Sequence, residues 1–442
     1  MIAPLLARWR TAAVAAVVAL AGGCASTPGP AERPDLIAIT NVTVIDVAAG
    51  VGRPGMTVVA DHERILSVAP GARAPSGARR IDGTGRFLIP GLWDMHAHHQ
   101  ATGVESLPVF VANGVLGTRD MGSDADFILP LRDRVKAGEV LGPRIVAAGP
   151  MLDDAPEGYP WRLTVKTAAE AVAAVAALDA RGVDFIKVHD HTPREAYFAI
   201  AAEARRRGLP FAGHVPSAVT IAEAAEAGQV SFEHLANNRV FTHCRPDCAA
   251  AYAQLVAKGV WQTPTIAFYQ RIPGLLSGEA PPESEYASPG LLRLLEENAR
   301  AANLSREARA MLEAQNRQAL VAIAEMRAAG IGFLAGCDGL TAGFCTHDEM
   351  EWMTRAGLTP AAALRTATLN PATFLGRQDR EGLIAPGYRA DMVLLEANPL
   401  ADIRNTRRIA TVVLGGRVLD RATLNRMLEE ARATFRSGAS AG

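Results

Sequence analysis

Short apolar runs alternate with longer alanine-rich segments through the middle of the chain. Apolar runs of this length, bounded by turn residues, are typical of buried strands. They span residues 87–95, 114–119, 144–148, 185–188, 211–213, 230–232, 261–265 and 331–335. Helical patterns such as residues 167–180 and 194–207 lie between them. The alternation predicts parallel strands with right-handed crossovers, and eight strands predict a (β/α)8 TIM barrel over residues 88–381.

The two ends of the chain have a different texture. Residues 37–87 and 382–420 contain short β-prone runs separated by turn residues, and Gly415-Gly416 is a hairpin signal. These segments predict one small β-sandwich built from both ends. Residues 289–329 are mostly helical and longer than one crossover needs, which predicts an extra helix pair near the barrel mouth. Residues 421–442 are predicted to form a C-terminal helix and tail.

The first residues are typical of a targeting segment. Arg8 and Arg10 precede an apolar run at residues 11–21, which is too short to span a bilayer comfortably. Small residues then lead to Cys24 and resemble a bacterial lipobox, although Ala21 stands where Leu is usual. Residues 1–24 are therefore predicted to be a signal peptide and Cys24 a lipidated residue. Residues 25–36 would form a flexible tether, and the protein would lie in the periplasm, anchored at the outer membrane. Cleavage near Ala25 to give a soluble periplasmic protein is the alternative.

Composition limits the possible partners. The chain has 442 residues and a net charge of −1, so no basic surface predicts nucleic acid, and a membrane would be reached only through the lipid. Export permits disulfides among the four remaining cysteines. A local Cys244–Cys248 bridge is expected, whereas a bridge between Cys337 and Cys345 is left open.

Side chains able to bind a metal or move a proton follow five predicted strands. In His96-Ala97-His98, residues i and i+2 point to the same side of an extended chain. Taken singly, such residues are usually solvated, core or helix-capping groups. Their joint placement predicts a shared site, because four of only ten histidines lie at strand ends and functional residues of a barrel cluster there. The set is His96, His98, Lys187, His214, His234 and Asp338.

These motifs resemble those of the amidohydrolase superfamily. The segment Ile89 to His98 is similar to its first metal motif, and the order H-x-H, Lys, His, His, Asp resembles its binuclear branch. The phrases at residues 185–188, 213–216 and 233–235 are similar to Xaa-Pro dipeptidase-like and imidazolonepropionase-related enzymes. Residues 383–393 resemble the return into that family's β-sandwich. One departure is Cys337, where the family commonly has Thr.

The resemblance implies a site with two divalent cations, zinc suiting its imidazole and carboxylate ligands best. His96, His98 and Asp338 would bind the more buried cation. His214 and His234 would bind the second, and Lys187, N-carboxylated by CO2, would bridge both. Cations about 3.5–4 Å apart can share a hydroxide that attacks a carbonyl. Asp338 would take its proton as general base and deliver it as acid.

Other polar residues are candidates for substrate contact. His189 and His191 follow Lys187 closely, and His347 lies in the last predicted loop of the barrel. His347 would either orient the substrate or cap a helix. Tyr159 and Arg162 lie in a Gly/Pro-rich loop, a common position for specificity elements. Arg162 could hold a substrate carboxylate or remain a solvated surface residue.

The resemblance implies hydrolysis of a C–N bond in a small substrate, with a dipeptide or an N-acyl amino acid expected. Hydrolysis of cyclic amides, lactones or esters on the same centre is the second enzymatic hypothesis. Deamination is disfavoured because the mononuclear deaminase pattern lacks a lysine at the position of Lys187. The non-enzymatic hypothesis is a lipid-anchored protein that binds metal or solute. A homo-oligomer is permitted by the sequence.

Overall fold

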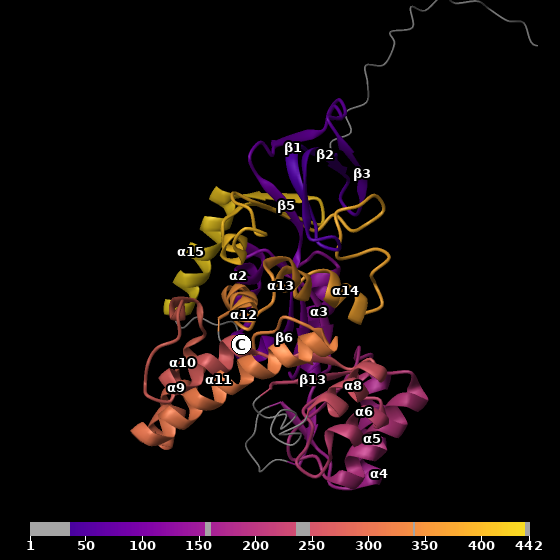
Figure 1. Cartoon of the computed structure of the whole chain (residues 1–442), viewed down its shortest axis with the longest axis vertical. Coiled ribbons are helices and arrows are strands. Elements are labelled where there is room, and N and C mark those ends of the chain that lie inside the picture. Colours follow the sequence, from indigo (N-terminus) through magenta and orange to yellow (C-terminus); the bar gives the residue numbers. More distant parts are fainter. Residues whose placement is uncertain (1–35, 155–160, 236–247, 339–340, 438–442) are drawn as a thin grey trace, which may run out of the picture.

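The computed structural model describes residues 36–154, 161–235, 248–338 and 341–437 (Figure 1). The predicted signal peptide and tether, including Cys24, lie outside the described residues, as do Tyr159 and Cys244. No helix among the described residues is long and apolar enough to cross a membrane.

Strands from both ends of the chain share one mixed sheet of eight strands, at the top of Figure 1. The C-terminal β16 pairs antiparallel with β5, which in turn pairs parallel with the N-terminal β1. Buried aliphatic side chains from its own strands form a core, Ile39, Val58 and Leu394 among them. The predicted joining of the two ends is therefore confirmed, but a second sheet that would make a sandwich is not. The sheet contains β1 (Ile37–Asp46), β2 (Val51–Ala60), β3 (Ile65–Pro70), β4 (Arg79–Asp82), β5 (Phe87–Pro90), β16 (Met392–Leu395), β17 (Ile409–Leu414) and β18 (Arg417–Asp420).

The first predicted barrel strand is divided in two. Its first half, β5, belongs to the terminal sheet, and its second half, β6 (Leu92–Ala97), begins a parallel sheet. Gly91 lies at the break. A Cβ at this position would lie 2.7 Å from the Leu116 side chain, so only glycine lets the chain pass there without a shift.

The parallel strands of the middle form two sheets. One contains β6, β7 (Val115–Asp120) and β8 (Arg144–Ala147), in that order. The other runs in the order β10 (Arg162–Thr164), β9 (Met151–Asp153), β11 (Ile186–Val188), β12 (Phe211–Gly213), β13 (Ser231–Glu233), β14 (Trp261–Thr263) and β15 (Gly332–Phe333). All eight predicted strands are present, with β9 and β10 in addition.

Hydrogen bonds join the two parallel sheets at two places. Met95 donates its N–H to Ala335 O at 2.8 Å, and Asp184 donates to Ala147 O at 2.8 Å. These bonds join β6 to the end of β15 and β8 to the start of β11. The described strands thus form a barrel-like α/β arrangement without one continuous closed ladder, so the predicted closed barrel is not observed as such.

Helices cover the parallel strands where the sequence predicts crossovers. Thr167 accepts the Glu170 N–H and so begins α4, while Gly208, with φ of 72°, ends α5. The helices are α1 (His99–Thr102), α2 (Leu107–Ala112), α3 (Ala125–Lys136), α4 (Ala168–Ala180), α5 (Arg194–Arg207), α6 (Ile221–Ala227), α8 (Ala249–Ala257), α12 (Phe344–Arg355), α13 (Pro360–Thr366) and α14 (Leu369–Phe374). Short 3₁₀ turns are η1 (Val104–Ser106), η2 (Ser284–Tyr286) and η3 (Ile403–Arg407).

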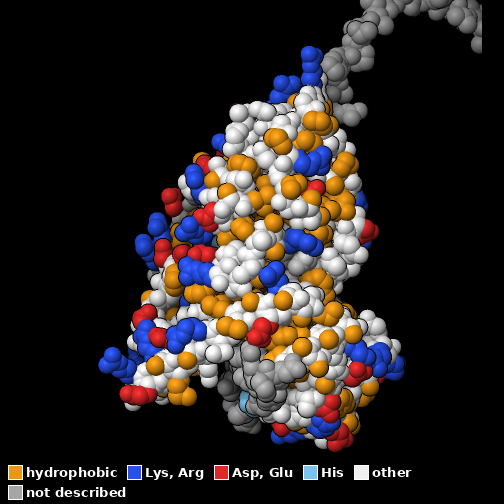
Figure 2. All heavy atoms as spheres, viewed as in Figure 1, with side chains coloured by type: hydrophobic (Ala, Val, Ile, Leu, Met, Phe, Trp, Pro, Cys, Tyr) orange, Lys and Arg blue, Asp and Glu red, His pale blue; other side chains and the backbone are white. Residues whose placement is uncertain are grey.

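The predicted extra helix pair is α10 (Pro289–Ala302) and α11 (Arg306–Ala329), which lie with α9 (Ile266–Leu275) in a lobe at the lower left of Figure 1. The predicted C-terminal helix is α15 (Arg421–Ser437), which packs on α2. On the face drawn in Figure 2, acidic and basic side chains are interspersed, as expected for a net charge near zero.

Candidate metal centre and active site

Three imidazoles surround one carboxylate where the parallel strands end. Asp338 Oδ1 lies 3.5 Å from His96 Nε2 and 3.3 Å from His98 Nε2, and Asp338 Oδ2 lies 3.9 Å from His234 Nε2. His96 comes from β6, His234 directly follows β13, and Asp338 follows β15 by five residues. Residues 242 positions apart in the sequence therefore meet at one point, as the barrel prediction requires.

His214 and Lys187 complete the predicted set. The His214 ring lies 4.8 Å from the His234 ring, centroid to centroid. Lys187 is buried on β11, and its positive charge lowers the pKa of His96, His214 and His234. Burial lowers the pKa of Lys187 itself to about 8. All six residues predicted from strand ends thus lie in one cluster.

Glycine at position 213 makes room for the lysine. A Cβ there would lie 2.9 Å from Lys187 Cδ and 2.2 Å from Val188 O. Gly213 also has φ of 130°, which L side chains rarely adopt. Gly213 therefore leaves space for the aliphatic part of the Lys187 side chain, and the next residue, His214, supplies an imidazole to the cluster.

In all four histidines, a second group engages Nδ1. His96 donates to Glu233 Oε2 at 2.9 Å, His98 to Gly122 O at 3.0 Å, and His214 to Asp190 Oδ1 at 2.7 Å. A 2.7 Å hydrogen bond joins His234 Nδ1 to Thr265 Oγ1. Such partners fix the ring orientation, and in His96 and His214, which donate Nδ1–H to carboxylates, they leave Nε2 with its lone pair, as in metal-binding histidines.

Electrostatics keep most of these rings neutral. Burial, followed by the charge of Lys187, holds the pKa of His96 well below its usual range. Burial lowers the pKa of His234 to about 4. His98 differs. Burial, the largest effect, lowers its pKa, but the hydrogen bond to Asp338 and the negative charges of Asp338 and Asp120 together outweigh burial and raise the pKa. Neutral imidazole is the form that binds a cation.

A buried ion pair lies behind His96. Arg119, on β7 and 1% exposed, donates to Glu233 Oε1 at 2.8 Å, to Ser231 Oγ at 2.9 Å and to Met95 O at 2.7 Å. Glu233 thus accepts from both Arg119 and His96. The sequence analysis did not identify this support, although an arginine and an acid in two short buried strands are a usable signal, because a buried charge requires a partner.

Backbone strain is concentrated at the same place. His234, Asp338 and Thr265 have positive φ angles of 62°, 58° and 48°. Non-glycine residues in this region cost roughly 1–3 kcal/mol each and cluster at functional sites. For Thr265, a β-branched residue, the conformation is unusual, and here it places Oγ1 against His234.

The residues predicted to contact substrate have different positions. His189 Nδ1 lies 3.2 Å and Arg162 Nε 2.9 Å from Oδ2 of the buried Asp153. His191 donates its backbone N–H to Asp153 Oδ1 at 2.8 Å. Arg162 is therefore paired within the protein at 9% side-chain exposure, not solvated on the surface. His189 stays close to the centre, since its ring lies 4.0 Å from that of His214.

The prediction for His347 is wrong. This residue lies inside α12, is 1% exposed, and has both ring nitrogens hydrogen-bonded, Nδ1 to Thr406 Oγ1 at 2.9 Å and Nε2 to Asn113 O at 3.0 Å. Neither nitrogen is left for a substrate, and the residue is not a helix cap. Its sequence position after the last strand did not indicate which side of α12 points toward the metal-binding cluster.

Two aromatic residues border the cluster. The Trp161 ring stacks on the His98 ring with centroids 6.3 Å apart and planes 24° apart. The Tyr269 ring lies 5.6 Å from the His234 ring, and burial together with the charge of Asp338 raises the pKa of its hydroxyl. Trp161 immediately precedes β10, and Tyr269 lies in α9, the helix that follows β14.

The open disulfide question is also decided for one pair. Cys337 and Cys345 form a disulfide that ties the residue before Asp338 to α12. Asp94 accepts the Cys337 N–H at 3.0 Å and the His96 N–H at 3.0 Å. The chain segments that carry His96 and Asp338 are thereby fastened to each other.

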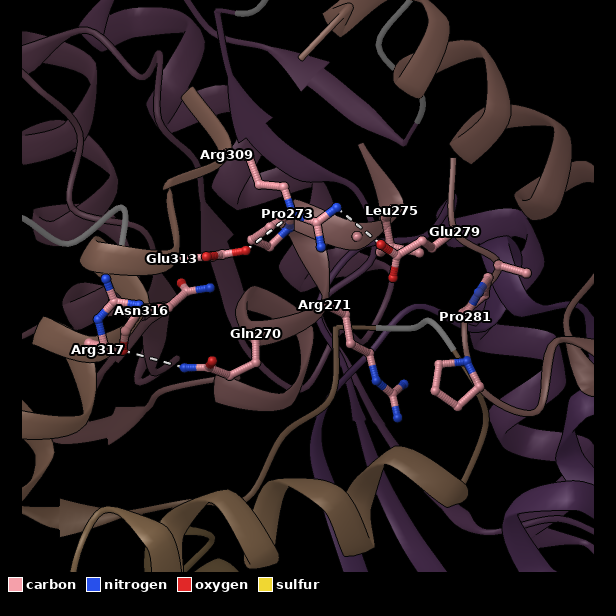
Figure 3. A pocket seen from close by; sticks show the side chains of 13 residues that line it. Gln270, Arg271, Pro273, Leu275, Glu279, Pro281, Arg309, Glu313, Asn316 and Arg317 are labelled. Atoms are coloured by element: carbon pink, nitrogen blue, oxygen red, sulfur yellow. Dashed lines mark hydrogen bonds and ion pairs between the residues drawn. The ribbon is translucent and has the colours of Figure 1, made fainter. Parts of the chain in front are cut away.

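A polar pocket of about 390 Å³ lies between α9 and α11, away from these histidines. Figure 3 shows Arg309 between Glu313 and Glu279, and its nitrogens lie 3.1 Å from an oxygen of each. Arg271, on the same wall, pairs with Asp348. None of the predicted metal-binding residues lines this pocket, so it is not part of the candidate centre.

The residues fit a bound metal. His96 Nε2 is buried and has no hydrogen-bond partner among the described residues, and His96, His234 and Asp338 can each offer a ligand atom within 4.8 Å of one another. An orphaned, neutral, oriented imidazole beside a carboxylate is costly unless a cation binds there. Fold and site together define a barrel-like α/β hydrolase of the metal-dependent class.

The comparison with known proteins agrees. The chain belongs to the amidohydrolase family, whose model matches residues 87–419, and it is thus a hydrolase acting on carbon–nitrogen bonds. It is 24% identical to an ochratoxinase of Aspergillus niger over 79% of this chain and 78% of that protein.

Two solved structures show the same fold. A bottromycin amidohydrolase matches with a TM-score of 0.74 and 24% identity, covering 91% of each chain. A prolidase in complex with N-methylphosphonate-L-proline matches with a TM-score of 0.69 and 22% identity, covering 87% of this chain and 99% of that one. The suspected superfamily is confirmed by the family model, and these structures share its fold.

Proposed function

We propose that this protein is an exported amidohydrolase that cleaves the C–N bond of a small dipeptide or N-acyl amino acid at a centre of two divalent cations, zinc fitting best. One observation carries the proposal: four imidazoles with engaged Nδ1 atoms converge near Asp338 and the buried Lys187. A pocket lined only by uncharged side chains, or a catalytic site built from one general acid and one general base, would not need four oriented imidazoles around a carboxylate.

His96, His98 and Asp338 would hold one cation, and His214 and His234 the other. Lys187 would bridge them as a carbamate, because an ammonium surrounded by imidazoles would repel cations whereas a carbamate oxygen binds them. Its burial, within the same cluster, supports this assignment. Asp153, His189 and His191 form a neighbouring group that could hold a metal. Asp153 is already paired with the positive charge of Arg162, which disfavours a further cation there.

The cations, when bound, supply a water of lowered pKa and polarise the substrate carbonyl. Asp338 contacts both His96 and His98 and is therefore placed to accept a proton from the attacking water. The protonated carboxyl then delivers this proton to the leaving nitrogen, which departs as a neutral amine. Burial by itself would raise the pKa of Asp338, but its interactions with His234, His98 and Lys187 together lower it, so Asp338 begins the reaction as a base.

The prolidase among the structural neighbours holds a proline phosphonate, and this supports a dipeptide-sized substrate. The test is a screen of metal-replete protein against dipeptides and N-acyl amino acids, with lactones and esters as parallel sets. We expect turnover to be confined to amides or to exceed that on esters and lactones. Two bound cations with turnover only on lactones or esters, or on none of the sets, would overturn the proposal.

Export rests on the N-terminal segment alone. If Cys24 is lipidated, Cys24→Ser expressed in a Gram-negative host should move the protein from the membrane fraction to the soluble periplasmic fraction. Met311→Gln, at an exposed residue outside the targeting segment, is the control and should leave the fractionation as it is. Unchanged fractionation of Cys24→Ser would exclude the lipid anchor.

A further inference from the structure

A second pocket adjoins the candidate centre. It has a volume of about 470 Å³, within the usual range for small-molecule sites. Its apolar wall consists of Val104, Phe127, Trp161, Leu291 and Leu294. These residues come from the segments that follow β6 and β7, from the start of β10 and from α10, so the pocket opens at the end of the barrel where the histidines lie.

Trp161 joins this pocket to the centre. Its ring lines the pocket and also stacks on His98, whose Nε2 is 3.3 Å from Asp338. Its backbone has φ of 56°, a strained value for an aromatic residue. The strained backbone and the stacking together fix the indole in the wall shared by pocket and centre.

Helix α10 forms the opposite wall and is anchored at its start. Ser288 Oγ donates to Ala101 O at 3.0 Å and accepts the Leu291 N–H at 3.2 Å, which joins α10 to the residues after His98. No residue of α10 is buried, and Leu294 is 47% exposed. The apolar face of this helix is thus fixed beside the pocket while still in contact with water, and burial of an apolar ligand against it would be favourable.

The side chains that line the pocket indicate which kind of ligand it favours. Glu105 and Arg293 also line the pocket and carry opposite charges, so neither an anionic nor a cationic group is strongly preferred. The two rings, Trp161 and Phe127, favour a flat aromatic group through offset or edge-to-face contacts.

We propose that this pocket is a subsite that binds an aromatic group of the substrate next to the scissile bond. The inference rests on the proposed function and narrows it to dipeptides or N-acyl amino acids that carry an aryl group.

The test measures binding without turnover. Metal-replete protein is titrated calorimetrically with 1-naphthylacetate and with acetate, which share a carboxylate and differ in the ring. We expect naphthylacetate to bind at least about tenfold more tightly. Trp161→Ala should remove most of this difference, Trp161→Phe should restore much of it, and Leu294→Gln should reduce it severalfold.

Met311→Gln is the matched control, because Met311 is an exposed apolar residue, 65% exposed on α11, that does not line the pocket. It should leave the difference unchanged. Equal affinity for the two probes in the wild type, or an equal effect of Leu294→Gln and Met311→Gln, would overturn the subsite. Tight naphthylacetate binding in a protein that hydrolyses no amide would instead refute the proposed function and leave the subsite intact.

Discussion

Glu233 and His96 are joined by a hydrogen bond of 2.9 Å in a place closed to solvent, with Glu233 Oε2 accepting from Nδ1. The other carboxylate oxygen is 2.8 Å from the Arg119 guanidinium. The position of the His96 ring is thus fixed by a charge that is itself paired. This relationship makes Glu233 a positioning residue for the candidate centre.

Glu233→Gln should weaken metal binding by about 10–100-fold, the usual effect of removing such a partner. The amide nitrogen would face Nδ1 and favour the tautomer with its proton on Nε2, the atom directed at Asp338. Competition with a chromophoric chelator measures the affinity. Glu396→Gln, on the surface, is the control, and equal affinity of both variants would exclude the positioning role.

Lys187→Ala should lose one of two cations together with activity, because the bridging carboxylate would be absent. Elemental analysis of the purified protein gives the metal content per chain. Lys166→Ala, at an exposed lysine, should keep both cations. If Lys187→Ala also keeps two, the bridge is excluded.

Asp338→Asn should retain most of its metal but lose roughly 10²–10⁴-fold in turnover, the range typical of general acid–base catalysis. Asparagine keeps an oxygen ligand but cannot take up the proton. Turnover is measured on the best amide from the screen, with metal content determined on the same sample. A nearly unchanged rate would remove Asp338 from the proton transfer.

Glu349 gives a prediction on stability and pH. This residue of α12 is fully buried, accepts the Ala267 N–H at 2.7 Å, and burial raises its pKa to about 8. The negative charges of Asp94 and Asp348 act in the same direction. Between the ordinary value of 4.5 and about 8, the folded state keeps a proton that the unfolded state has lost. Stability should therefore fall as the pH rises through this window.

The slope contributed by Glu349 approaches about 1.4 kcal/mol per pH unit within the window. Glu349→Gln, which keeps an acceptor for the Ala267 N–H but does not ionise, should flatten the dependence. Urea unfolding at pH values from 5 to 8 measures it. Glu351→Gln, two residues along the same helix, should leave the slope in place; parallel slopes for Glu349→Gln and the wild type would contradict the assignment.

Much of the architecture follows from the sequence because its signals are local. Period and length identified the eight parallel strands and the helices between them, and the β-prone ends join in one sheet as expected. The six strand-end residues could be selected because parallel strands bring their carboxyl ends to the same edge. The structure adds local detail that the pattern does not give. Gly91 divides the first predicted strand into β5 and β6, and Gly213 leaves room for the Lys187 side chain.

The remaining features depend on contacts between distant residues. Glu233 with Arg119, and Asp153 with Arg162, are pairings that span 114 and 9 positions and depend on which face of each strand turns inward. His347 and the pocket beside Trp161 depend on the rotation of α12 and on the position of α10, which no local pattern specifies. The sequence alone determined which residues stand at strand ends, because hydrophobic period is a property of neighbours. The tertiary structure decided which groups support them and which pocket adjoins them, because the partner of a buried charge or ring is selected by packing across the whole fold.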